Sequence, residues 1–252
     1  MIPLKLRIIR EQNRIYTRLL RVLSFIQPLG PKVFIFHDIL DDVSQVKSQF
    51  AISQTSFESF LNYQLHSGHH PNTFDELRKI VSGEVKKQDN SFTVTFDDAN
   101  ESVYTKAFPF LKQRNIPFII FVTVELIGKP NFLTKEQIVE MANNSLCTIG
   151  SHALHHKMFR YMTDNEAIME YIESRTYLQQ LTHQNVDCFA FPYGRLIEIS
   201  CKNIKVLKQT SYKFAFSAIV GNLNHLWLSG KYYLPRINVS ETVAQKSLIT
   251  NH

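Results

Sequence analysis

The chain has 252 residues, of which 44% are hydrophobic and 20% charged, a composition typical of a soluble globular protein with one or two domains. Eight glycines and nine prolines are too few for a disordered or fibrous chain, and no run of about 18 apolar residues predicts a transmembrane helix. Residues 1–26 contain six basic side chains and one acid, so they carry +5 of the net charge of +6, and the nearly neutral remainder argues against nucleic-acid binding.

The first 26 residues predict a basic amphipathic helix. On a helical wheel, Ile8, Ile15 and Leu19 fall within about 40° of one line, and arginines occupy an adjacent flank. Two interpretations stay open. The helix either anchors the protein on an anionic membrane surface or packs on the domain with a solvated basic face. We therefore expect an N-terminal helix within residues 1–30, followed by a single domain over residues 31–252.

Short apolar strands alternate with helical patterns after Pro31. Strands are predicted over 33–36, 92–96, 118–122, 147–149, 188–191, 214–217 and 232–234. Helices are predicted over 56–65, 74–81, 101–114, 134–143, 163–181 and 202–208. This alternation predicts parallel βα units and an α/β fold. No glycine-rich phosphate loop follows any strand, so the pattern favours a (β/α) barrel over a nucleotide-binding sheet.

Two adjacent carboxylates, Asp97 and Asp98, come directly after the predicted strand over 92–96. Neighbouring side chains at the end of a strand point in different directions, so one aspartate can bind a metal while the other acts as a base. By itself, such a pair is also typical of a turn that caps a helix.

A histidine cluster follows the predicted strand over 147–149. His152 and His156 are four residues apart, and on a helical turn this spacing would place both rings on one face, close enough to share one ion. His155 lies at i+3 and is predicted to be a neighbour rather than a ligand. Two histidines and one carboxylate would leave coordination positions open for water, as catalytic metal sites do.

Several short motifs together resemble one known family. They are Thr95-Phe96-Asp97-Asp98, then Gly150-Ser151-His152 with His156, then Phe189-Ala190-Phe191-Pro192-Tyr193-Gly194. In this order they resemble the motifs of the polysaccharide deacetylases, the NodB-homology family. The segments around His37 and Arg236 resemble its exopolysaccharide branch, typified by poly-N-acetylglucosamine deacetylases. The resemblance runs from about Val33 to Val239 and implies a distorted (β/α) barrel of about seven parallel strands.

The resemblance also implies a metal site. Carried over position by position, it makes Asp98, His152 and His156 the ligands of one divalent ion and Asp97 the general base. Zn²⁺ is the expected metal, and Co²⁺, Ni²⁺ and Fe²⁺ suit the same ligand types.

The resemblance assigns four further residues. Arg236 is expected to lie against the base, and the backbone N–H of Tyr193 to stabilise the oxyanion. Pro192 and Tyr193 are expected to contact substrate, and His37 to act as an acid or a substrate contact. The sequence departs from the family where Ala99 replaces a glycine and Ala153 a hydroxyl residue, and a C-terminal Leu-x-His motif is absent.

These residues predict metal-dependent de-N-acetylation of an N-acetylated sugar, in a surface polysaccharide or its precursor, with release of acetate. The alternatives are a de-O-acetylase or other amidohydrolase on the same site, and a non-catalytic glycan-binding barrel. Three cysteines without a CxxC pair and the lack of a secretory signal pattern predict a cytoplasmic protein. If the basic helix over residues 1–26 is a membrane anchor, the protein would contact the inner face of the membrane through it.

Overall fold

The computed structural model describes residues 30–45, 48–86, 89–225 and 230–249, together with residues 8, 11, 14, 15, 18 and 19. Most of the predicted N-terminal helix, residues 1–26, therefore lies outside the described residues. The six described positions in this stretch are helical, and Ile8, Ile15 and Leu19 are exposed. Within the described ranges, no helix combines the length and apolar character needed to cross a bilayer.

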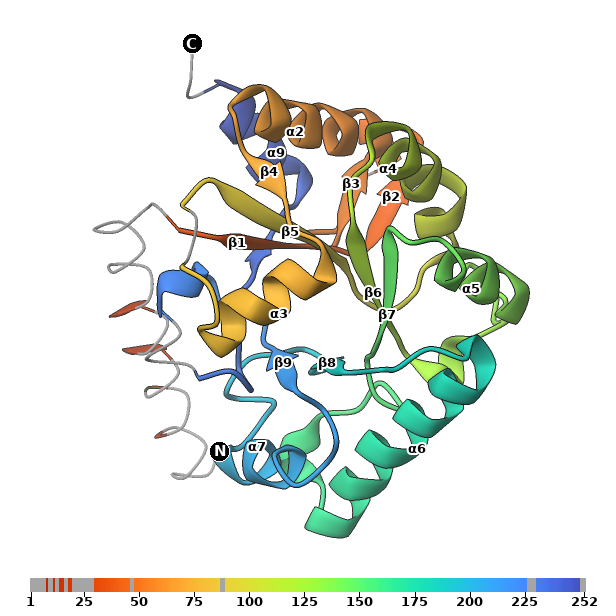
Figure 1. Cartoon of the computed structure of the whole chain (residues 1–252), viewed down its shortest axis with the longest axis vertical. Coiled ribbons are helices and arrows are strands. Elements are labelled where there is room, and N and C mark those ends of the chain that lie inside the picture. The colour runs from red at the N-terminus through yellow and green to blue at the C-terminus, as the bar shows by residue number, and fades with distance from the viewer. Residues whose placement is uncertain are drawn as a thin grey trace.

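Seven parallel strands form the central sheet (Figure 1). Their spatial order is β10 (Ile237–Asn238), β1 (Lys32–Phe36), β5 (Ser91–Phe96), β6 (Phe118–Val122), β7 (Cys147–Ser151), β8 (Cys188–Ala190) and β9 (Phe214–Phe216). A short strand, β4 (His70–Pro71), pairs with β5. Leu234 bridges to Phe216 of β9, and β10 then pairs with β1, so the chain after β9 joins the two edges of the sheet. The predicted distorted (β/α) barrel is confirmed.

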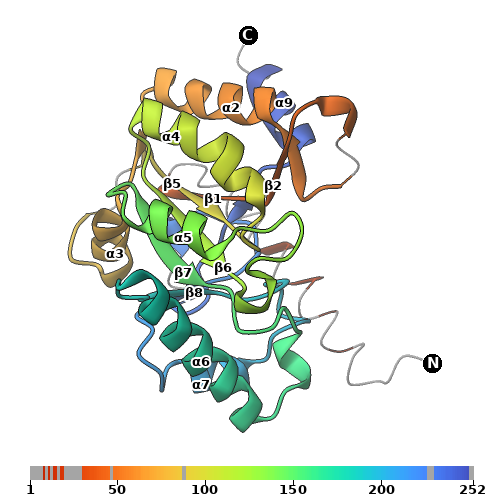
Figure 2. The same cartoon turned by 90° about the vertical axis from the view of Figure 1, so that its right-hand side faces the viewer.

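Helices surround the sheet. They are α2 (Gln54–His66), α3 (Phe74–Ser82), α4 (Phe108–Arg114), α5 (Lys135–Ala142), α6 (Asp164–Thr182), α7 (Cys201–Leu207) and α9 (Glu241–Ile249). Figure 2 shows α2, α4, α5 and α6 on one outer side of the sheet. Capping boxes explain where several helices begin, because Thr73, Thr134 and Thr163 each accept a hydrogen bond from the third helical residue.

Side chains alternate between two apolar layers along the strands. Phe118 and Ile120 of β6 pack toward the outer helices, whereas Ile119 and Phe121 belong to a separate interior cluster. A Cβ on Gly150 of β7 would lie 2.5 Å from the Phe121 ring, so only glycine leaves room for that ring. Leu77 and Ile80 of α3 join the same interior cluster, and α3 therefore covers one end of the barrel.

Two local predictions need correction, and one small sheet was not predicted. The strand expected over 232–234 is displaced to β10, because Pro235 has no N–H for a ladder and pairing with β1 begins at Ile237. The helix expected over 101–114 contains a π-helical turn, Val103–Ala107, before α4. A small parallel sheet of β2 (Asp38–Leu40) and β3 (Ala51–Ser53), together with β4, was not predicted, because strands of two or three residues leave little periodicity to detect.

Candidate metal centre

The polar residues singled out in the sequence come together at one edge of the barrel. His37 follows β1, Asp97 and Asp98 follow β5, His152 follows β7, and Tyr193 lies beyond the end of β8. Parallel strands end on the same side, so these loops meet at the carboxyl face, where (β/α) barrels carry their functional sites. The sheet order places β1, β5, β6 and β7 side by side, which brings the first three loops within reach of one another.

Asp98, His152 and His156 form a compact set of ligand-type side chains. Their candidate ligand atoms all lie within 4.8 Å of one another. Asp98 Oδ1 is 3.4 Å from His152 Nε2 and 3.2 Å from His156 Nε2. Ligands about 2.05 Å from a tetrahedral ion are separated by about 3.3 Å, which matches both distances. Asp98 Oδ1 is buried without a well-formed hydrogen bond in the described part of the chain, so the donor set fits a small divalent cation.

Hydrogen bonding orients the His152 ring. Its Nδ1 lies 2.8 Å from the Ala190 carbonyl oxygen, an acceptor, so Nδ1 carries the proton of this hydrogen bond and Nε2 is the ring nitrogen directed at Asp98. The His156 ring lies 5.2 Å from the His152 ring and 4.7 Å from that of Tyr193, measured between centroids. Burial opposes ionisation of Asp98, but the two neighbouring imidazoles outweigh it and hold the pKa of Asp98 far below its ordinary value.

The expected helical turn between the two histidines is wrong. Residues 152–158 form an irregular loop between β7 and the 3-10 turn η4 (Phe159–Tyr161). Ala153 has a φ of +72°, which turns the chain in a way that no α-helix allows. His152 and His156 therefore approach through the shape of this loop, and the i, i+4 spacing matches a helix only by coincidence.

Asp97 faces a fully buried arginine. Arg236 donates through Nη1 to Asp97 Oδ1 and through Nη2 to Oδ2, both at 2.7 Å. Its guanidinium also donates to the Ser217 carbonyl oxygen at 2.8 Å and lies 5.5 Å from the Phe121 ring centroid. Burial would raise the pKa of Asp97, but the charges of Arg236, His152 and His37 together lower it. Asp97 is thus an ionised carboxylate, 3.9 Å from His152 Nε2.

Two aromatic side chains flank the histidines. The Phe50 ring lies 5.0 Å from the His37 ring and is 51% exposed, and Tyr193, beside His156, is 46% exposed. Burial lowers the pKa of His37 more than the nearby aspartates raise it. Its Nδ1 is buried and has no hydrogen-bond partner among the described residues. Phe50 was not predicted, because the loop that brings it to His37 belongs to the unpredicted β2–β3 sheet.

Two carboxylates missed by the sequence reasoning hold the histidine loop. Glu170 of α6 accepts hydrogen bonds from the Leu154 and His155 amides, and Glu125 of the 3-10 turn η3 (Val124–Leu126) accepts one from the His156 amide. Neither glutamate stands in a motif, and only the folded chain brings them to the loop.

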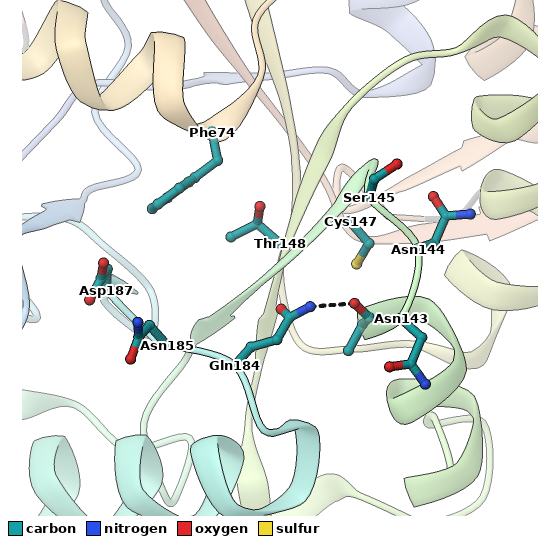
Figure 3. A pocket seen from close by; sticks show the side chains of 10 residues that line it. Phe74, Asn143, Asn144, Ser145, Cys147, Thr148, Gln184, Asn185 and Asp187 are labelled. Atoms are coloured by element: carbon teal, nitrogen blue, oxygen red, sulfur yellow. Dashed lines mark hydrogen bonds between the residues drawn. The ribbon is translucent and has the colours of Figure 1, made fainter.

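A cavity of about 600 Å³ lies away from these residues (Figure 3). It opens at the amino ends of β7 and β8, where Cys147, Thr148 and Asp187 line it together with Phe74 of α3. Gln184 donates to the Ala142 carbonyl oxygen across one wall. This cavity is therefore at the end of the barrel opposite the Asp98 cluster.

Comparison with known proteins gives consistent matches. The family model described as polysaccharide deacetylase matches residues 84–215, more than half of the chain. The poly-beta-1,6-N-acetyl-D-glucosamine N-deacetylase of Staphylococcus aureus (strain MRSA252) is 27% identical over 215 residues, covering 76% of this chain and 69% of the relative. Among solved structures, IcaB from Ammonifex degensii has a TM-score of 0.75 at 24% identity, covering 87% of this chain and 95% of that one. Streptococcus pyogenes deacetylase PplD, solved in complex with acetate, has a TM-score of 0.76 at 19% identity, covering 88% and 97%. The two structures support the fold.

Proposed function

This chain belongs to the polysaccharide deacetylase family, and we propose that it is a carbohydrate de-N-acetylase that uses a divalent metal held by Asp98, His152 and His156. One observation carries the proposal. One carboxylate and two imidazoles form a group that could hold a metal ion. A second, ionised carboxylate, Asp97, lies beside them and is not one of these candidate ligands. Metal-assisted hydrolysis of an amide uses both parts, the ion as Lewis acid and the free carboxylate as base.

A divalent ion bound there supplies a Lewis acid for the amide carbonyl and lowers the pKa of water. Asp97 accepts the proton of the attacking water, because its bidentate pair with Arg236 keeps it ionised and fixes its orientation. Arg236 is buried beside the Phe121 and Phe216 rings, which restricts its movement away from the site.

Two other groups suit the later steps of the reaction. The Tyr193 amide donates to no group within the described part of the chain, and it is available to the negative charge that develops on the carbonyl oxygen. His37, whose buried Nδ1 has no hydrogen-bond partner among the described residues, is placed to protonate the leaving amine or to bind the sugar. Pro192 precedes Tyr193 and shapes the substrate-facing turn after β8.

The substrate we propose is an N-acetylglucosamine polymer or its precursor. The S. aureus relative is named for poly-beta-1,6-N-acetyl-D-glucosamine, and exposed Phe50 and Tyr193 offer flat apolar surfaces suited to pyranose rings. De-O-acetylation on the same site is the second candidate, since the same groups activate water toward an ester.

We also propose that the protein works at the inner face of the membrane through residues 1–26. The support is the charge of this segment and the exposure of Ile8, Ile15 and Leu19. Deleting residues 1–28 should move the protein from the membrane fraction to the soluble fraction. Unchanged fractionation would refute the anchor.

The proposed reaction is tested by measuring acetate release and metal content together. N-acetylglucosamine oligomers and O-acetylated sugars should be compared, with Zn²⁺ quantified in the same preparations. His152→Ala should lose both metal and activity, and Asp97→Asn should keep the metal while losing activity. His66→Ala, an exposed histidine at the end of α2, is the matched control and should change neither. Bound metal without acetate release from any glycan would instead support a binding protein.

A further inference from the structure

The loop over residues 152–156 carries both candidate histidine ligands but has no regular secondary structure. A neighbouring strand fixes one end, because the His152 amide donates to the Val122 carbonyl oxygen at 2.9 Å, and at the other end the His156 amide donates to Glu125 Oε1 at 3.2 Å. Between the ligands, the Ala153 and Leu154 carbonyl oxygens accept hydrogen bonds from the Val124 and Glu125 amides, whereas the Leu154 and His155 amides need a restraint from another element. The separation of the two imidazoles depends on this intervening backbone.

Glu170 supplies that restraint from outside the loop. Its Oε2 accepts hydrogen bonds from the Leu154 amide at 3.0 Å and the His155 amide at 2.8 Å. Its Oε1 lies 2.8 Å from His155 Nδ1, which must donate because a carboxylate only accepts. Both oxygens are therefore directed at the segment between His152 and His156.

The position of Glu170 makes this restraint stiff. The residue lies inside the longest helix of the domain, α6, and its exposure is 7%. A buried carboxylate is costly unless hydrogen bonds satisfy it, so it holds its three donors in place rather than exchanging them for water. The contact also binds the His155 Nδ1 to Glu170, which keeps this imidazole out of the Asp98 cluster.

We propose that Glu170 is a positioning residue that sets the geometry of the metal site by fixing the loop between its two histidines. The inference rests on the proposed function, since it presumes that Asp98, His152 and His156 bind a divalent cation. A residue that holds ligands in place in this way typically contributes 10–100-fold to metal affinity, on the order of other groups that orient metal ligands.

The test compares two substitutions of similar length. Glu170→Gln keeps an oxygen for the two amides and an NH₂ group for His155 Nδ1, so metal affinity should stay within about threefold of the unmodified protein. Glu170→Met fills the same space without hydrogen bonds and should weaken Zn²⁺ binding roughly 10–100-fold. Glu173→Met, an exposed glutamate one turn along the same helix, is the control and should leave the affinity unchanged.

The measurement is the dissociation constant for Zn²⁺, obtained by competition with a chromophoric chelator, together with the visible spectrum of bound Co²⁺. A purely structural role would lower thermal stability without altering either quantity in the folded protein. If E170M does not fold, Glu170→Asp replaces it, because the shorter side chain keeps the charge but cannot reach both amides.

The outcomes separate the two hypotheses. If the unmodified protein binds no Zn²⁺ or Co²⁺, the proposed metal site itself is wrong. If it binds metal and E170M, or E170D in its place, binds within threefold of it, only the positioning role is overturned. Equal weakening in E170Q and E170M would also overturn it, because the carboxylate would then act through its charge rather than through hydrogen bonds.

Discussion

Replacing Arg236 with methionine should leave a buried carboxylate without its cation. Methionine fills much of the space that Arg236 occupies beside the Phe121 and Phe216 rings but offers no donor to Asp97. The reverse change, Asp97→Asn, removes the charge on the other side of the pair. The double variant removes both charges at once and completes a double-mutant cycle.

The expected loss in free energy of unfolding follows from the contacts of Arg236. Arg236 makes two charged hydrogen bonds to Asp97 at 2.7 Å, one to the Ser217 carbonyl oxygen at 2.8 Å and one to the Thr95 hydroxyl at 3.2 Å. Hydrogen bonds to charged groups contribute about 1.5–3 kcal/mol each, and breaking a buried ion pair from one side costs about 3–5 kcal/mol. We expect Arg236→Met to lower the free energy of unfolding by about 4 kcal/mol. For a chain of this size that is a decrease in Tm of roughly 10 °C.

The assay is denaturant unfolding followed by circular dichroism, in chelator so that metal binding does not contribute. The double variant should be destabilised by at least about 2 kcal/mol less than the sum of the single variants. A coupling energy below about 0.5 kcal/mol would refute the view that the two side chains act as one buried pair.

The same substitution should move the pH dependence of catalysis. Arg236 is one of the charges that lower the pKa of Asp97, so its removal should raise that pKa. The base must be ionised to work, and the acidic limb of kcat/KM should therefore shift to higher pH in R236M. Arg236→Lys keeps a positive charge without the bidentate geometry and should shift the limb less. An unshifted limb in R236M would exclude Asp97 as the group that titrates.

Three further changes test other parts of the fold. Ala99→Gly should raise the free energy of unfolding by up to about 1 kcal/mol, because Ala99 has a φ of +66°; a loss of stability in thermal unfolding would contradict this. Glu241 accepts hydrogen bonds from the Ser53 amide and a neighbouring hydroxyl, which lower its pKa although burial opposes them. Its contribution is present above the unfolded pKa of about 4.3 and is lost as pH falls, so Glu241→Gln should destabilise by about 1–2 kcal/mol at pH 7 and little at pH 3. Phe50→Ala should raise KM for acetylated oligomers about fivefold with little change in kcat, because it removes about 1 kcal/mol of stacking on the sugar ring. A change in kcat alone would argue against Phe50 as a stacking surface for the sugar.

The edge of the barrel at which the site residues meet could be predicted from the sequence. Asp97 and Asp98 follow one apolar strand, and His152 follows another, so a parallel sheet places them at a common edge whatever the loops do. Knowing where the strands end is enough to predict this edge, and the positions of the side chains are not required.

The details of the loops could not be predicted in the same way. The spacing of His152 and His156 indicated a helical turn. Ala153 instead adopts a positive φ, which the intrinsic preference of alanine disfavours. The conformation is held by η3 and by Glu170, which lies 15 residues away in sequence from His155 and belongs to another element. Local propensity carries no information about such a contact.

Backbone conformation and site position are related in this chain. Among the described residues, the non-glycine positions with positive φ away from the site are of types that tolerate it, namely Asn115, Asn131 and His183. Those at the strand ends around the candidate metal centre are Asp98, Ala99, Ala153 and Tyr193.

Alanine and tyrosine do not favour this conformation, and each instance costs on the order of 1–3 kcal/mol unless its surroundings impose it. Ala99 and Ala153 are buried, so packing holds both in place. The strain therefore lies in the loops that bring Asp98, His152 and His156 together and in the neighbouring turn at Tyr193. A fold selected for stability alone would place glycine at these turns, as it does at Gly83 after α3. Ala99, Ala153 and Tyr193 thus adopt backbone conformations that their residue types disfavour, and this indicates that the loops are shaped for a ligand.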